Sequence, residues 1–159
     1  AEFDLAALIR QVSDLYHAQD PRVAFGLRLD RGATMIEADR GRIRQLLNNL
    51  LTNSLEALDG RPDPVIMIET SRTGDQIVLT VTDNGPGFQA GIAGQAFDPY
   101  VTSKPKGTGL GLAIVRRIVE EHGGQVELAN APGGGARISV SLPAAARAAR
   151  AGEARREQA

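Results

Sequence analysis

Apolar residues recur with a helical period in three stretches of this chain. The stretches cover residues 5–15, 42–58 and 110–122. Asp4 and Asp39 stand just before the first two, where an aspartate side chain caps the free N–H groups of a helix. The pattern therefore predicts three helices.

Shorter apolar runs between these stretches predict strands. They cover residues 24–29, 34–37, 64–71, 76–82, 125–129 and 136–142. Turn-forming residues at 73–75 and 132–135 join the last four into two hairpins. Paired strands indicate a mixed, mostly antiparallel sheet of about five strands, rather than a strict βα alternation. We therefore predict an α+β fold, a two-layer α/β sandwich with the three helices on one face.

Length and composition set the limits of this fold. The 159 residues suggest one domain, which we place at 1–143, and 42% hydrophobic residues suffice for a core. Residues 144–159 contain no leucine, valine or aromatic residue, so we expect a disordered tail. A net charge of −1 argues against a partner bound by charge, such as nucleic acid, and the absence of cysteine excludes disulfides and thiolate metal sites.

Three polar motifs are candidates for chemistry, and the first is the stretch 83–88. Asp83 closes a predicted strand, and Gly85 and Gly87 follow it. A carboxylate there can accept a hydrogen bond from an exocyclic amine, and the glycines let a flat ligand approach the backbone. The same residues also suit an ordinary turn.

The second motif is the glycine-rich start of the third predicted helix. Gly107, Gly109 and Gly111 stand where unpaired N–H groups attract phosphate. No lysine follows the last glycine and no strand precedes the loop, so the motif is neither a P-loop nor a dinucleotide fingerprint. The alternative is a flexible hinge.

The third motif is a polar stripe on the second helix. Gln45, Asn49, Asn53 and Glu56 follow one another at helical spacing. Asparagine has a poor helix propensity, so two of them one turn apart need a reason. Either the stripe faces solvent, or the amide oxygens bind Mg²⁺ while a nucleotide supplies the charge.

Together and in this order, the motifs resemble the ATP-binding catalytic domain (HATPase, of the GHKL or Bergerat type) of bacterial sensor histidine kinases. Residues 49–54 resemble the N box of that family, 83–87 its G1 box and 107–112 its G2 box. Residues 96–104 resemble the F box, which begins a mobile lid over ATP, and we expect the irregular segment 88–106 to be this lid. The end of the N box at residues 56–57 and the short lid before Gly107 are most similar to the nitrogen-regulation kinases of the NtrB and NtrY types.

The resemblance implies ATP and Mg²⁺ as the ligands. Asn53 would bind Mg²⁺, and Asn49 would lie near the phosphates as a catalytic residue. Asp83 would accept a hydrogen bond from the adenine amine, while Gly85 and Gly87 would leave room for the base to bind.

The resemblance also implies phosphate contacts from the lid and from the G2 box. The G2 box residues are Gly107, Thr108, Gly109, Leu110, Gly111 and Leu112. Thr102 would contact phosphate from the lid, and Lys104 would do so as a second catalytic residue. Some members carry a lysine where this chain has Glu56, so that contact would pass to Lys104 or Lys106.

One departure bears on the reaction. Related gyrase, chaperone and mismatch-repair ATPases carry a glutamate, acting as general base, where this chain has Asn49. An amide cannot take up a proton at neutral pH. We therefore expect ATP binding with poor hydrolysis, and transfer of the γ-phosphoryl to an external acceptor.

The acceptor histidine is not found in this chain. His17 lacks the acidic and Asn-Pro context of the family's acceptor, and His122 suits a partly charged cap at the end of the third helix. We therefore expect a monomeric catalytic domain that acts on its kinase's dimerisation domain and, through it, on a response regulator. The domain would be cytoplasmic, in a parent that could be anchored in the inner membrane. The alternatives are a non-catalytic nucleotide-binding or docking module, and a related GHKL ATPase or serine kinase.

Overall fold

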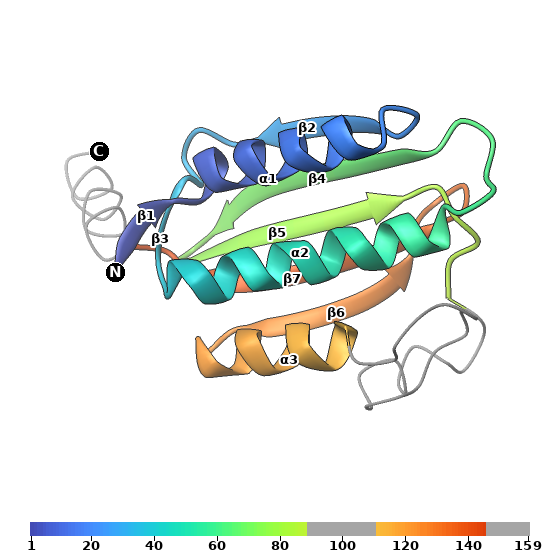
Figure 1. Ribbon diagram of the computed structural model, residues 1–159. Helices are drawn as coiled ribbons and strands as arrows, with labels where there is room; N and C mark the ends of the chain where they lie inside the picture. Colours follow the sequence, from blue (N-terminus) through green and yellow to red (C-terminus); the bar gives the residue numbers. More distant parts are fainter. Residues whose placement is uncertain (89–110, 146–159) are drawn as a thin grey trace.

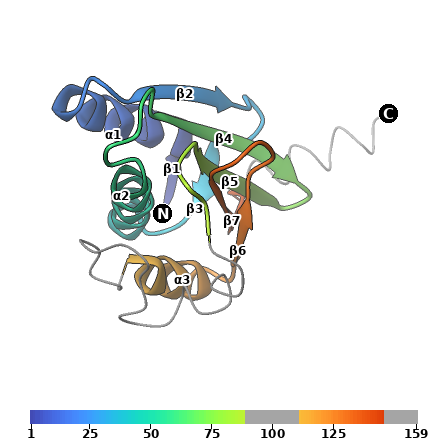
Figure 2. The same cartoon turned by 90° about the vertical axis from the view of Figure 1, so that its right-hand side faces the viewer.

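The computed structural model describes residues 1–88 and 111–145. Its elements, in chain order, are β1 (Glu2–Asp4), α1 (Leu5–Gln19), β2 (Ala24–Leu29), β3 (Met35–Glu37), α2 (Arg40–Ala57), β4 (Val65–Thr73), β5 (Gln76–Asp83), α3 (Gly111–Glu121), β6 (Gln125–Asn130) and β7 (Ala136–Pro143). The helices form one layer and the large sheet forms the other (Figures 1 and 2). None of the helices in the described residues combines the length and apolar character that crossing a membrane requires.

The large sheet has five strands in the order β2-β4-β5-β7-β6. β2 runs parallel to β4, and the other neighbours are antiparallel. Both predicted hairpins, β4–β5 and β6–β7, are present. The expected α+β fold, with a mixed five-stranded sheet and three helices on one face, is therefore confirmed.

The core lies between the helices and the inward face of the sheet. The apolar side of α2 contributes Leu46 and Leu50, and the sheet contributes Ile68, Leu79 and Val140, all fully buried. Burying a leucine or isoleucine contributes about 1.5–3 kcal/mol, so this apolar layer holds the helices on the sheet. Leu15, which the pattern placed on the apolar face of the first helix, is instead 50% exposed.

A small ribbon closes one end of the domain. β1 pairs with β3, which is the strand expected at residues 34–37. The sequence does not predict β1, which has only three residues. The chain also continues past Pro143, where the predicted domain ends. Ala144 bridges Ile36, and the N–H of Ala145 donates to the carbonyl of Met35 at 3.0 Å. Both alanines are buried, so these two residues belong to the fold, while 146–159 lie outside the described residues.

The two histidines have structural partners. His17 is exposed on α1, and its Nδ1 lies 3.0 Å from the carbonyl oxygen of Val23. Nε2 of His122 accepts from the N–H of Asp39 at 3.1 Å, and its Nδ1 lies 2.7 Å from the carbonyl oxygen of Ile118. The Nδ1 contact with a carbonyl oxygen of the last turns of α3 places His122 at the helix end, where a cap was expected.

Candidate functional site

Asp83 ends β5 and is 3% exposed. Its Oδ1 accepts from the N–H of Gly85 at 2.9 Å and from the N–H of Ala136 at 3.3 Å. Within the described part of the chain, no group donates to Oδ2. A carboxylate oxygen of a buried aspartate that receives no such donor suits a ligand that brings one.

Gly85 brings the loop after Asp83 against the end of α2. A Cβ at this position would lie 2.9 Å from Oδ1 of Asp83 and 3.0 Å from the carbonyl oxygen of Ala57. Any side chain would push the loop away from the helix. Glycine is therefore needed here for a close approach of two backbones.

A stripe along α2 starts at this contact. Ala57 touches the loop, and Asn53 and Asn49 lie one and two turns earlier on the same face. At 1.5 Å per residue, the two amides are displaced from Ala57 by about 6 and 12 Å along the helix axis. The stripe thus connects the carboxylate of Asp83 with two amide side chains.

The side-chain amide of Asn49 has a buried donor that is not satisfied by the residues that the structure describes. Its Nδ2 atom is buried and has no hydrogen-bond partner in residues 1–88 and 111–145. A buried donor left in this state costs about 1–3 kcal/mol, so its retention fits an acceptor supplied by a ligand, such as a phosphate oxygen. The chemistry of the stripe therefore suits a phosphorylated ligand.

The N-terminus of α3 lies on the same side of the molecule. α3 packs antiparallel to α2, with Gly111 beside the C-terminal half of α2 (Figure 1). A Cβ at Gly111 would meet no atom within 4 Å. The Leu112 side chain packs against the core, so its predicted phosphate contact falls to its backbone N–H.

Two asparagines outside the predicted site hold the loop between Asp83 and Phe88. Asn84 accepts from the N–H of Val65 at 2.8 Å and donates to the carbonyl oxygen of Asp63 at 2.8 Å. Asn130, at the end of β6, bonds both backbone groups of Phe88. Sequence reasoning missed both residues, because an asparagine at a turn gives no sign of its distant partner.

Gly135 is a third support that sequence reasoning assigned to a turn alone. It has a φ of 98° and lies against the carbonyl group of Asp83 and the Cα of Asn84, where a Cβ would overlap them. Gly87, with a φ of 80°, faces the same hairpin. The only sequence signal was the run of three glycines, 133–135, which is more than a hairpin turn requires.

The remaining predicted site residues fall between the two described parts of the chain. They are Thr102, Lys104, Gly107, Thr108, Gly109 and Leu110. The predicted lid, beyond Phe88, lies there too.

The fold and this site define a class of ATP-binding domain. A family model described as histidine kinase-, DNA gyrase B- and HSP90-like ATPase matches residues 38–146, and the chain belongs to this family. Within it, the chain is similar to the catalytic domains of sensor histidine kinases, as its motifs indicated.

Two curated relatives illustrate this similarity. The nitrogen regulation protein NtrY of Azorhizobium caulinodans is 40% identical over 147 residues, which are 89% of this chain and 19% of the relative. The signal transduction histidine-protein kinase AtoS of Escherichia coli is 39% identical over 123 residues, which are 77% of this chain and 20% of the relative. This chain thus spans about a fifth of the length of these relatives. The predicted likeness to nitrogen-regulation kinases is confirmed.

Solved structures agree with the fold. The nucleotide-free catalytic domain of histidine kinase ThkA superposes with a TM-score of 0.82 at 33% identity, covering 91% of this chain and 95% of that domain. Full-length ShkA, solved in complex with AMPPNP, superposes with a TM-score of 0.77 at 30% identity, covering 91% of this chain and 31% of ShkA.

Proposed function

We propose that this chain is the ATP-binding catalytic domain of a two-component sensor histidine kinase. It would transfer the γ-phosphoryl of ATP to a histidine on a dimerisation domain, for relay to a response regulator. One observation carries this proposal. Among the described residues, Oδ2 of Asp83 and Nδ2 of Asn49 have no partner, and they lie at opposite ends of the stripe that runs from Ala57 along α2. This arrangement suits a base at one end and phosphates at the other.

Each residue of the stripe has a part in this proposal. Asp83 accepts a hydrogen bond from the 6-amino group of adenine through Oδ2. Asn49 donates to a phosphate oxygen, and Asn53 presents its amide oxygen to Mg²⁺. When bound, Mg²⁺ would neutralise charge on the phosphates.

The donor set fits such an ion. Among residues 1–88 and 111–145, no group of three or more acidic, histidine or cysteine side chains is placed to hold a metal. Mg²⁺ commonly binds through one or two protein oxygens with waters and substrate phosphates, which is what this site offers.

The same residues favour transfer over hydrolysis. Asn49 can hold a phosphate oxygen but cannot take a proton from water. The bond between the γ-phosphorus and the bridging oxygen would therefore break only as an imidazole nitrogen of the acceptor histidine bonds to phosphorus, with ADP as the leaving group. Positioning and charge neutralisation are sufficient for this reaction.

The partners and location follow from the family. ThkA has been solved in complex with the response regulator protein TrrA. By analogy, this domain would act as a monomer on the dimerisation domain of its own kinase, which then passes the phosphoryl group to a response regulator. Its place would be the cytoplasm, with the parent kinase anchored in the inner membrane.

Phosphotransfer tests the proposal. The chain is mixed with a separately made dimerisation domain of its kinase and with ATP labelled at the γ-phosphate. We expect label on the acceptor histidine and little free phosphate, and no label on an acceptor whose histidine is replaced by alanine. Rapid phosphate release without phosphohistidine would instead indicate an ATPase, and binding without either product a non-catalytic module.

A further inference from the structure

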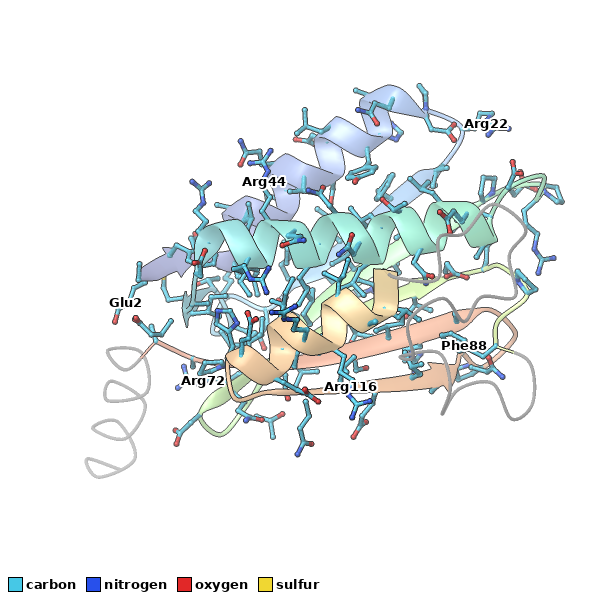
Figure 3. The ribbon with its side chains drawn as sticks, turned by 60° about the horizontal axis from the view of Figure 1, so that its bottom comes forward. Glu2, Arg22, Arg44, Arg72, Phe88 and Arg116 are labelled. Atoms are coloured by element: carbon cyan, nitrogen blue, oxygen red, sulfur yellow. The ribbon has the colours of Figure 1, made fainter. Side chains whose placement is uncertain are left out.

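The β6–β7 hairpin holds the loop 83–88 at both of its ends. At the first end, the N–H of Ala136 donates to Oδ1 of Asp83 at 3.3 Å. At the second, the N–H of Phe88 donates to Oδ1 of Asn130 at 2.7 Å, and Nδ2 of Asn130 donates to the carbonyl oxygen of Phe88 at 3.2 Å. Figure 3 shows Phe88 beside this hairpin. Residues 42 positions apart are thus joined by a two-pronged contact.

The contact requires an asparagine. Bonding both backbone groups of one residue takes a donor and an acceptor on the same short side chain, which an amide has and a carboxylate or hydrocarbon does not. The loop is also shaped to receive it. A Cβ at Gly87 would lie 2.7 Å from Oδ1 of Asn130 and 3.0 Å from the carbonyl oxygen of Gly135. The bare backbone at Gly87 therefore makes room for the hairpin.

Asn130 lies outside the core. Its side chain is exposed at the end of β6, and its two hydrogen bonds are its only ones in the described residues. Removing the side chain would free the end of the loop while leaving the buried layer of the sheet intact. The residue is therefore placed to affect the loop more than the stability of the domain.

We propose that Asn130 is a positioning residue for recognition of the adenine amine. The inference rests on the proposed function, because it takes Asp83 as the acceptor of that amine. Asn130 touches no nucleotide itself. By fixing Phe88, it fixes the far end of the loop that begins at Asp83, so that the free oxygen of Asp83 meets the base in one geometry.

Calorimetric titration of two ligands tests this role. The variants are N130A and, as a matched control, Q125A, an exposed residue at the other end of β6 whose side chain makes no contact with the loop. The ligands are Mg-ATP and purine riboside triphosphate, which lacks the 6-amino group. We expect N130A to raise the Kd for ATP about 5- to 10-fold, the effect of about one lost hydrogen bond. For the analogue we expect the Kd to change by less than about 2-fold, because without the 6-amino group the effects of the substitution and of the ligand are independent to within that limit. Q125A should change neither value.

The outcomes separate the two proposals. A wild-type chain that binds neither ligand would refute the proposed function. A wild-type chain that binds ATP, with N130A either unchanged or weakened equally for both ligands, would overturn the role of Asn130 alone. Should N130A fail to fold, hydrogen exchange of the backbone amides in the wild-type chain tests the role of Asn130 instead. The N–H of Phe88 should then exchange more slowly with ATP bound than with the analogue bound, and equal rates would overturn the inference.

Discussion

Arg42, in the first turn of α2, forms a two-pronged ion pair with Glu121, the last residue of α3. Nη2 of Arg42 lies 2.7 Å from Oε2 and 2.9 Å from Oε1 of Glu121, and Nε lies 3.2 Å from Oε2. Both side chains are only partly exposed. The pair ties together the two helices between which we place the phosphates, at the end away from that site (Figure 1).

The first prediction concerns the acid dependence of this contact. The pKa of Glu121 is lowered, chiefly by the hydrogen bond from Arg42. Desolvation opposes this shift, and Coulombic attraction from Arg42 and Arg117 adds to it. The pKa of Glu121 is lower in the folded chain than in the unfolded chain, where it is about 4.3. The ion pair therefore contributes fully to the unfolding free energy above the unfolded pKa, and this contribution is lost as the pH falls through the folded pKa. E121Q should therefore lower the unfolding free energy at pH 7 and much less at pH 3, as measured by urea unfolding.

The neighbouring glutamate is the matched control. In the part of the chain that the structure describes, Glu120 pairs with Arg116 of its own helix, at 2.9 Å. E120Q should therefore have a smaller effect at pH 7. If the loss of unfolding free energy in E121Q stayed the same or grew toward pH 3, the stabilising role of the ion pair would be contradicted.

The second prediction concerns His122, which links the same helix ends. H122A leaves the N–H of Asp39 and the carbonyl oxygen of Ile118 without their partner. We expect it to lower the unfolding free energy by about 1–2 kcal/mol, the usual effect of losing one or two hydrogen bonds. Thermal unfolding beside H17A, which removes one hydrogen bond to Val23 and an edge-on ring contact with Phe25, checks this. A smaller loss for H122A than for H17A would show that the link is weak.

Much of the fold could be predicted from local pattern. Helical periodicity, N-cap aspartates and glycine-bearing turns placed three helices and both hairpins. The short strand at 34–37, which contains β3, could be predicted, but its partner β1 could not. Three residues directly before a helix show no periodicity, and β1 depends on a partner more than thirty residues away. For the same reason the pattern ended the fold at Pro143, although Ala144 and Ala145 pair with residues at β3.

The site divides in the same way. Asp83, Asn49 and Asn53 are candidates that local motifs in the sequence indicate. Asn130 and Gly135 contact the loop 83–88 from the neighbouring hairpin. Neither an asparagine nor a glycine in a sequence indicates a contact with such a distant residue. The contact of His122 with the N–H of Asp39 could not be predicted, because the two residues are 83 positions apart.

The third prediction separates binding from folding at Asp83. In D83N the oxygen that accepts from Gly85 and Ala136 can be retained, while an NH₂ group replaces the free oxygen. That group would face the donor of the adenine amine. We expect ATP binding to weaken by at least ~1.5 kcal/mol, about tenfold in Kd, with little change in Tm. Calorimetry and thermal unfolding measure the two effects, and an unchanged Kd would remove the adenine assignment.

The fourth prediction concerns the metal. N53A removes the amide oxygen that we assign to Mg²⁺. We expect it to weaken ATP binding in the presence of Mg²⁺ more than in EDTA, because only the metal-dependent part uses this oxygen. Titrations with and without Mg²⁺ measure both parts. Equal losses under the two conditions would show that Asn53 is not a ligand.

The most direct measurement is a crystal structure of this chain with Mg²⁺ and a non-hydrolysable ATP analogue. The proposed site predicts the 6-amino nitrogen of adenine within about 3.2 Å of Oδ2 of Asp83. It also predicts Mg²⁺ about 2.1 Å from the amide oxygen of Asn53. A nucleotide bound elsewhere, or one whose base makes no contact with Asp83, would contradict it.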